Sequence, residues 1–342
     1  MKKSVEVGIA GYGTIGKRIA DAVLKQPDMK LVGIAKTKPD YAAYIARKKG
    51  IDVYATPPDN ESRFKEEEFP IAGTIDELIG KADIIIDTSP EKVGVKNKPM
   101  YERAGVKMIF QGGEKADVAE VSFCAQVNYD AALGKNSVRV VSCNTTGLSR
   151  VLYTIDQKYG IKQVKAVLVR RAADPKEDKG PINAIEPVLK VPSHHGPDLN
   201  TVLPHIKIAT MAVKVPTTLM HLHNVMIELD KEAKSEEVVR AFEDARRIIL
   251  VSGSHGVSAT HRITEITRDI GRPRYDLPEV AMWEDPISIV DGWLYLVFAV
   301  HQESIVVPEN IDAIRAMMEM ASKEESIKLT DKMLGILQAR LY

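Results

Sequence analysis

The sequence predicts an α/β protein of two domains, the first with a parallel sheet and the second, of the α+β class, with a mainly antiparallel sheet. Three observations support this prediction. Short apolar runs alternate with helical patterns up to residue 142, which is typical of a parallel sheet covered on both faces. Farther along, the apolar runs lengthen, and an Asp-Gly pair between two of them favours a hairpin. The 342 residues exceed what one core usually supports.

The first part of the chain contains strand patterns separated by helical ones. Strands are expected at residues 5–10, 31–35, 83–87 and 106–110, and in the run that ends at Cys143. Helical spacing of apolar residues is clearest at 15–24 and 99–104. The connection 55–73 is rich in Pro, Asp, Glu and Lys, so we expect it at the surface.

The second part predicts longer strands and then helices. The strands are expected at 164–169, 206–215, 217–229, 287–290 and 293–300, the last two joined by Asp291-Gly292. A turn-rich loop with five prolines spans 174–200. Ser235 has the character of a helix N-cap, and helices are expected from Pro308 to Met320 and over 327–337.

Composition excludes several classes of protein. The 47 basic and 47 acidic residues cancel, so nothing global favours nucleic acid or an anionic membrane as a partner. The longest apolar runs are too short to span a bilayer, and the N-terminus lacks the apolar core of a signal peptide. With only two cysteines there is no disulfide framework. We therefore expect a cytoplasmic protein.

The segment 11–16 is a G-x-G-x-x-G turn directly after the first strand and before a helix. Gly11 permits the tight turn, Gly13 lets the backbone approach a pyrophosphate, and Gly16 lets the helix pack closely on the strand. In this context the motif predicts a dinucleotide site in a Rossmann-type domain; the alternative is a glycine-rich turn without a ligand.

The end of the second strand bears on the choice of dinucleotide. Enzymes specific for NAD usually carry an acidic residue there, but this chain has Lys36, Thr37 and Lys38, with no carboxylate before Asp40. Two lysines and a hydroxyl suit a 2′-phosphate, which predicts good binding of NADP. The alternative is that both lysines are solvated surface charges.

Cys143 follows a β-branched run and precedes a helical pattern. It is therefore expected at a helix N-terminus, where unpaired N–H groups favour the nucleophilic thiolate and the N–H of Asn144 can hold an oxyanion. The alternative is a buried, inert cysteine. Beside a dinucleotide domain, the pattern favours oxidation of an aldehyde through a thioester.

That chemistry needs a base, for which histidine is best suited near neutral pH. His221 and His223 are two residues apart in one strand pattern and share a face. Other histidines are His194, His195, His205, His255, His261 and His301. The pair Arg170-Arg171 suits phosphate, although a salt-bridged strand end is the alternative. The segments 111–114 and 301–302 are further polar clusters after strands.

Several segments together resemble the archaeal-type phosphorylating glyceraldehyde-3-phosphate dehydrogenases. They are GYGTIGKR at 11–18, KTKPD at 36–40, FQGGEK at 110–115, SCNTTGL at 142–148, RRAADP at 170–175, PSHHGPD at 192–198, VPTTLMH at 215–221 and AVHQES at 299–304. The resemblance implies a nucleotide domain over 1–142, completed by helices in 305–342, and a catalytic domain over 143–304. It also implies a homotetramer.

The resemblance further implies roles for individual residues. Cys143 would be the acylated nucleophile, and the base would be a histidine of the segment 215–223, with His221 favoured over His223. The sugar phosphate would contact Ser142, Asn144, Thr145, Arg170, His194 and His195. The dinucleotide would contact Gly11, Gly13, Thr14, Ile15, Gly16, Lys36, Thr37, Lys38, Gly112, Arg171 and Gln302.

The predicted reaction is the reversible oxidation of D-glyceraldehyde 3-phosphate to 1,3-bisphosphoglycerate, with NADP or NAD and inorganic phosphate as co-substrate and without a metal. It would serve glycolysis or gluconeogenesis. One alternative is a semialdehyde or acyl-phosphate dehydrogenase of amino-acid synthesis. Another is a non-catalytic protein that binds NADP.

Overall fold

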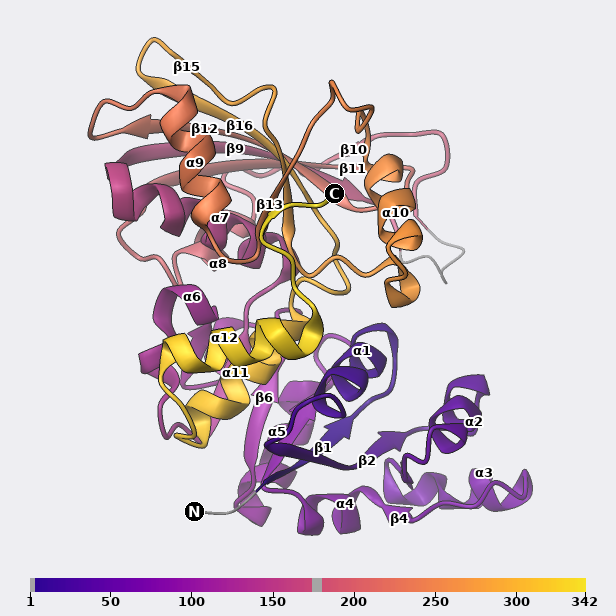
Figure 1. Cartoon of the computed structure of the whole chain (residues 1–342). Coiled ribbons are helices and arrows are strands. Elements are labelled where there is room, and N and C mark those ends of the chain that lie inside the picture. The colour runs from indigo at the N-terminus through magenta and orange to yellow at the C-terminus, as the bar shows by residue number, and fades with distance from the viewer. Residues whose placement is uncertain (1–3, 174–179) are drawn as a thin grey trace. The chain divides into compact units, whose positions relative to one another are not determined.

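The computed structural model describes residues 4–173 and 180–342. The chain forms two compact units (Figure 1). The first contains the residues up to Val141 together with Val307–Leu334, and the second contains Ser142–Val306 together with Gly335–Tyr342. Part of the predicted loop at 174–200 lies outside the described residues.

The first unit is built on an eight-stranded sheet in the order β4-β3-β2-β1-β5-β6-β8-β7. Its strands are β1 Val5–Ala10, β2 Met29–Lys36, β3 Val53–Ala55, β4 Gly73–Thr74, β5 Ile84–Asp87, β6 Lys107–Phe110, β7 Val121–Phe123 and β8 Ser137–Val140. All its strand pairs are parallel, which confirms the predicted parallel sheet. Every residue of β5 and β8 is buried, because helices cover both faces.

The first unit also contains helices, of which the last two follow most strands of the second unit along the chain. They are α1 Thr14–Val23, α2 Tyr41–Lys48, α3 Glu61–Glu66, α4 Ile75–Lys81, α5 Gly94–Ala104, α6 Ala125–Asn128, α11 Val307–Met317 and α12 Lys323–Leu334, with short 3-10 turns at Pro58–Asn60, Ala116–Val118 and Tyr129–Ala132. One core cluster joins Leu78, Ile85, Tyr101 and Phe110. The connection 55–73, expected at the surface, also contributes the buried Phe64 of α3.

The helices α11 and α12 return to the first unit, where α11 packs against α1 and β6 (Figure 1). A buried polar network holds them there. The Arg315 guanidinium donates to both carboxylate oxygens of Asp28, at 2.8 and 2.9 Å, and to Gln26 and Thr330 at 2.7 and 2.6 Å. A buried arginine needs such saturation of its donors. The contact with Thr330 joins α11 to α12, and the three contacts with Gln26 and Asp28 attach this tail to the connection between α1 and β2.

The second unit contains a nine-stranded mixed sheet in the order β10-β11-β9-β12-β16-β14-β13-β17, with β15 paired to β16. Its strands are β9 Ile161–Arg171, β10 Glu186–Pro187, β11 Ile208–Val215, β12 His221–Leu229, β13 Ile248–Val251, β14 Val280–Trp283, β15 Ser288–Val290, β16 Trp293–Val300 and β17 Ala339–Arg340. Antiparallel pairs predominate, as predicted. The Asp291-Gly292 hairpin is confirmed, and both of its turn residues have positive φ.

Helices of the second unit are α7 Cys143–Tyr159, α8 His195–Leu199, α9 Ser235–Asp244 and α10 Thr260–Asp269, with a 3-10 turn at Pro273–Tyr275. The long helix α7 packs against β9 and β16. Alternate residues of β12 are buried, beginning with His221 and His223, so the two histidines share a face as predicted.

The end of the chain differs from the prediction, which assigned all of 305–342 to the nucleotide domain. Gly335–Tyr342 lies with the second unit. There Ala339 pairs with Ile249, the N–H of Leu337 donates to Glu279 at 2.6 Å, and Leu341 is buried in the core. A two-residue strand has no periodicity to detect in a sequence, so only the tertiary pairing reveals it.

Candidate active site

The glycine-rich turn has the geometry that a dinucleotide requires. Gly11 has a φ of +95°, a conformation that L side chains rarely adopt, and its N–H donates to Ala35 at 3.2 Å. A Cβ on Gly16 would overlap the carbonyl oxygen of Gly11, so only glycine lets α1 start this close to β1. Thr14 and Ile15 open the helix and remain partly exposed. The backbone is therefore open to a pyrophosphate at the helix N-terminus.

The predicted 2′-phosphate residues lie beside this turn. Ala10 pairs with Ala35, so Lys36, the last residue of β2, is at the same carboxyl edge of the sheet as Gly11. Thr37 and Lys38 are exposed. The ammonium group of Lys36 forms an ion pair with Asp40 at 2.7 Å.

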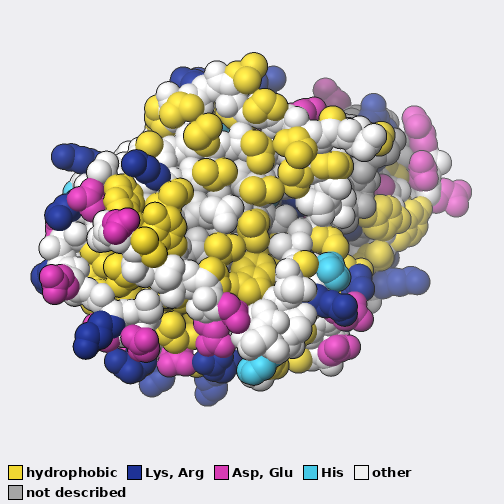
Figure 2. Space-filling model, turned by 90° about the horizontal axis from the view of Figure 1, so that it is seen from above, with side chains coloured by type: hydrophobic (Ala, Val, Ile, Leu, Met, Phe, Trp, Pro, Cys, Tyr) yellow, Lys and Arg dark blue, Asp and Glu magenta, His cyan; other side chains and the backbone are white. Residues whose placement is uncertain are grey.

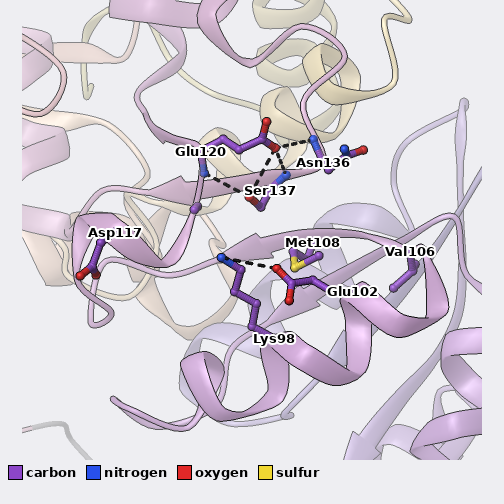
Figure 3. Close-up of a pocket in the computed structure, with 10 residues that line it drawn as sticks. Lys98, Glu102, Val106, Met108, Asp117, Glu120, Asn136 and Ser137 are labelled. Atoms are coloured by element: carbon purple, nitrogen blue, oxygen red, sulfur yellow. Dashed lines mark hydrogen bonds and ion pairs between the residues drawn. The ribbon is translucent and has the colours of Figure 1, made fainter.

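Gly112 lies in the turn after β6, at this same edge, where Gln111 exchanges two hydrogen bonds with Asn310 of α11. A cavity of about 530 Å³ lies at the opposite, amino-terminal edge of the sheet (Figure 3). Its polar groups pair with one another: Lys98 with Glu102 at 3.7 Å, and Glu120 with the backbone of Ser137 at 2.9 Å. We therefore place the candidate cofactor site at the carboxyl edge.

In the second unit, Cys143 is the first residue of α7 and is partly accessible. The preceding strand ends at Val140, and Ser142 is the N-cap of the helix, with its hydroxyl accepting the N–H of Thr145 at 3.4 Å. The predicted position of the cysteine at a strand-to-helix junction is confirmed.

The expected lowering of the Cys143 pKa is not what this environment produces. Burial raises the pKa of the thiol to about 11, against the opposing effects of Arg171, Arg170 and the N–H of Asn144. Glu303 adds a further increase. Loss of hydration thus outweighs the N–H of Asn144 and both arginines, and the thiol is protonated at neutral pH.

Alkylation of Cys143 by neutral iodoacetamide tests this pKa. Because only the thiolate reacts, we expect the rate to rise by about tenfold per pH unit from pH 7 to 10 without a plateau. Glu303→Gln removes a charge that raises the pKa of Cys143, so in this variant the alkylation rate is expected to rise at lower pH than in the wild type. The Cys143→Ser protein corrects for reaction at Cys124. A plateau near pH 7 would mean that the arginines outweigh burial.

Asn144 links Cys143 to His223. Nε2 of His223 lies 2.8 Å from Oδ1 of Asn144, and Nδ2 of the same carboxamide lies 3.7 Å from the Cys143 sulfur. A carboxamide oxygen only accepts, so Nε2 of His223 carries the proton in this arrangement. Burial lowers the pKa of His223 to about 3, which keeps the ring neutral at physiological pH.

His221 has a different set of contacts. Its Nδ1 accepts the backbone N–H of Arg171 at 3.1 Å. The Arg171 guanidinium in turn donates to Gln302 at 2.8 Å and pairs with Glu303 at 2.9 Å. Burial, together with the charges of His223 and both arginines, holds the pKa of His221 well below its ordinary value. A neutral His221 whose Nδ1 accepts must carry its proton on Nε2.

A second group of side chains has the character of an anion site. His195 is buried, and its Nδ1 contacts the hydroxyl of Ser193 at 3.0 Å. Burial and the charges of His194, Arg170 and His223 lower its pKa to about 2. Among the described residues, Nε2 of His195 and Nε of Arg170 are buried without a hydrogen-bond partner. An unsatisfied guanidinium N–H fits an anionic ligand, and so does His195 in the tautomer that carries its proton on Nε2.

Thr145 joins the histidine segment to the N-terminus of α7. Its hydroxyl donates to Asp198 of α8 at 2.5 Å and lies 2.9 Å from the hydroxyl of Ser142. A carboxylate only accepts, so the proton of Thr145 points to Asp198 and the proton of Ser142 points to Thr145. The lone pairs of Ser142 then remain for the helix N–H groups.

The predicted site residues divide between the two units. The first unit holds one set: Gly11, Gly13, Thr14, Ile15, Gly16, Lys36, Thr37, Lys38 and Gly112. The second unit holds the other: Ser142, Cys143, Asn144, Thr145, Arg170, Arg171, His194, His195, His221, His223 and Gln302.

Two carboxylates, Asp198 and Glu303, belong to these contact networks but were not predicted. Each lies in a segment that carried the family resemblance, three residues after His195 and directly after Gln302. Their positions next to predicted site residues were the signal in the sequence that could have identified them.

Comparison with known proteins supports the interpretation of the second unit as the one that carries the catalytic residues. Residues 142–272 match the family model described as glyceraldehyde 3-phosphate dehydrogenase, C-terminal domain, and residues 5–126 match dihydrodipicolinate reductase, N-terminus. The chain is 57% identical to a glyceraldehyde-3-phosphate dehydrogenase of Thermococcus sibiricus and 56% identical to one of Pyrococcus abyssi, in each case over 98% of this chain and 99% of the relative. A Methanosarcina mazei protein of the same name is 51% identical over 97% of this chain and 99% of its own.

Proposed function

The chain belongs to the glyceraldehyde-3-phosphate dehydrogenase family, and we propose that it catalyses the reversible oxidation of D-glyceraldehyde 3-phosphate to 1,3-bisphosphoglycerate. Inorganic phosphate would be the co-substrate and NADP or NAD the cofactor. The observation that carries this proposal is Cys143 at the start of α7, with Asn144, His223 and unsatisfied anion-binding donors in the same unit.

The chemistry follows from a thiolate and an aldehyde. The sulfur of Cys143 adds to the carbonyl carbon, and a C–S bond forms while the carbonyl oxygen gains the negative charge. A bound nicotinamide dinucleotide supplies the hydride acceptor for the oxidation. The resulting thioester on Cys143 is attacked by a phosphate oxygen, the C–S bond breaks, and the sulfur leaves as thiolate. Because the pKa of the free thiol is about 11, a base must take its proton as the C–S bond forms.

We assign the role of base to His223 rather than to His221, which the sequence favoured. The backbone N–H that holds Nδ1 of His221 cannot rotate, so Nε2 of a neutral His221 stays a donor. The partner of His223 is a carboxamide, which can turn and present either its oxygen or its NH₂ group. His223 can therefore change tautomer and accept a proton at Nε2, while His221 is suited to donate a hydrogen bond to an oxyanion.

The substrate phosphate is assigned to Arg170, His194 and His195. Nε of Arg170 and Nε2 of His195 lack partners among the described residues; a phosphate oxygen accepts from the first, and also from the second when Nδ1 of His195 accepts the Ser193 hydroxyl. Arg171 is less suited to this task, because its guanidinium already donates to Gln302 and Ala173 and pairs with Glu303.

A panel of substrates tests the proposed reaction. We expect kcat/KM for D-glyceraldehyde 3-phosphate to exceed that for aspartate semialdehyde by about a hundredfold or more, because the anion-binding donors recognise a phosphate ester. Reduction of 1,3-bisphosphoglycerate should proceed as well. Faster turnover of aspartate semialdehyde would support the amino-acid-synthesis alternative, and NADP binding without turnover of any aldehyde would support the non-catalytic one.

We also propose a homotetramer. Large apolar side chains stand exposed on β11 and the segment beside it: Ile182, Ile185, Leu189, Val191 and Met211. The N–H of Val188 donates to Ala212 of β11 at 2.9 Å, which holds this segment along the strand. Hydrophobic side chains also gather over the centre of the face in Figure 2, with charged ones around it. Apolar patches of this kind mark protein interfaces. Sedimentation as a monomer at micromolar concentration would contradict the proposal.

The compartment is proposed from the cysteines. Neither cysteine forms a disulfide, and Cys124 is fully buried. Cysteines outside disulfides fit a reducing compartment, so we assign the enzyme to the cytoplasm. Among the described residues, no helix has the length and apolar character needed to cross a membrane. Cell fractionation followed by an activity assay tests the assignment.

A further inference from the structure

Asp40 makes contacts at the cofactor edge of the first unit that nothing in the family assignment explains. It follows Lys36 by four residues and is the N-cap of α2. Its Oδ1 accepts the N–H groups of Ala42 and Ala43, at 3.1 and 3.2 Å, and its Oδ2 accepts the Lys36 ammonium at 2.7 Å. Both carboxylate oxygens are thus engaged within the protein.

Lys36 is the residue whose charge this pairing affects. Its side chain is only 11% exposed, so its interaction with Asp40 is less screened by water than that of a surface pair. It lies at the end of β2 beside the glycine-rich turn, where the adenosine ribose of a dinucleotide is held in this type of sheet. Its ammonium group is therefore a donor available at this edge for a 2′-phosphate.

Asp40 is ionised at neutral pH. Burial disfavours the charged carboxylate, but the Lys36 ammonium and the two helix amides together hold the pKa of Asp40 below its ordinary value. The charge has two effects on a 2′-phosphate: it draws the ammonium of Lys36 toward α2, and it repels the phosphate itself. Neither effect acts on the neutral 2′-hydroxyl of NAD.

Asp40 also differs from the usual ribose acceptor of NAD-specific enzymes. That acceptor is an acidic residue at the end of the second strand with an oxygen open to the ribose hydroxyls. In this chain, both oxygens of Asp40 already accept hydrogen bonds. Removal of the Asp40 carboxylate is therefore not expected to weaken the binding of NAD.

From these contacts we propose that Asp40 determines cofactor specificity, by competing with the 2′-phosphate of NADP for the Lys36 ammonium and so keeping NAD usable. The inference rests on the proposed function only in taking a nicotinamide dinucleotide as the ligand of this edge.

The test is Asp40→Asn, measured by direct titration of NADP and NAD. Asparagine is as good an N-cap as aspartate, so α2 is preserved while the charge is lost. We expect NADP to bind about three- to tenfold more tightly and NAD to change by less than about twofold. In a Lys36→Met background, no ammonium remains to be released, so the gain for NADP is expected to fall to the smaller part that comes from relieved repulsion between Asp40 and the phosphate.

A matched control is Asp21→Asn. Asp21 forms an ion pair of 2.6 Å with Lys49, at the other end of α2 and in the same unit. This variant changes the net charge equally, so an equal gain in NADP binding would overturn the proposal, as would an unchanged NADP to NAD ratio in Asp40→Asn. Weaker NAD binding in Asp40→Asn would instead identify Asp40 as the ribose acceptor and also overturn it. A wild-type protein that binds neither dinucleotide would refute the proposed function itself.

Discussion

Replacing Cys143 by serine is expected to lower kcat for D-glyceraldehyde 3-phosphate by about 10⁴-fold or more. The serine hydroxyl has the same shape but ionises far less readily than a thiol, and an oxygen ester would replace the thioester. Ser142 still caps α7 in this variant, so the fold and the binding of NADP are expected to remain. Steady-state oxidation of the aldehyde, followed through NADPH formation, measures the loss.

The control for this variant is Cys124→Ala, because Cys124 is the other cysteine and is fully buried in the first unit. It should retain activity and should still form an acyl adduct on the peptide that carries Cys143, detectable by mass spectrometry. Substantial activity in Cys143→Ser would refute the thioester mechanism, whatever the family assignment.

The local structure at Cys143 was predictable because its causes are local. A β-branched run, a serine able to cap a helix, and apolar residues at helical spacing lie within about twenty consecutive residues. The glycine-rich turn and the Asp291-Gly292 hairpin were predictable for the same reason, since both depend on residues that permit positive φ.

The ionisation of the cysteine was not predictable in this way. Its pKa depends on burial and on Arg170 and Arg171, which lie on β9, more than twenty residues farther along the chain. The helix terminus alone suggested a lowered pKa, whereas tertiary burial raises it. Sequence patterns name the groups near a site but do not give the extent of desolvation, which decides the sign of the shift here.

The carboxylates illustrate the same limit. Asp198, Glu303 and Asp40 each lie in a recognisable motif, but their partners are a threonine on α7, an arginine on β9 and a lysine on β2. An acidic residue near a functional segment is common at a protein surface. Only the distance to a specific partner separates a positioning contact from a solvated charge.

The two histidines show why neighbouring candidates needed the structure. His221 and His223 share a face of β12, and strand periodicity treats them alike. What separates them is the second element that each contacts: β9 gives His221 a backbone N–H, and α7 gives His223 a carboxamide. The assignment of His223 as base depends on this difference in the partners' freedom to rotate.

Replacing each histidine separately tests the assignment of His223 as the base. In His223→Ala, we expect kcat to fall by about 10²- to 10⁴-fold with a smaller change in KM, because proton transfer from the Cys143 thiol is lost. In His221→Asn, the new Oδ1 can still accept the Arg171 N–H, so a loss of about tenfold or less is expected. Stopped-flow measurement of the first turnover separates this step from product release.

The pH profile gives a readout that mere structural damage would not produce. The pKa of His223 is lowered to about 3, so in the wild type the neutral base persists as pH falls below 6, and activity is expected to persist with it. Without His223, the thiolate must form directly, and the pKa of Cys143 is about 11. The residual rate of His223→Ala should therefore rise by about tenfold per pH unit between pH 7 and 10. If kcat fell further in His221→Asn than in His223→Ala, and the residual rate of His221→Asn rose with pH in this way, the role of base would belong to His221.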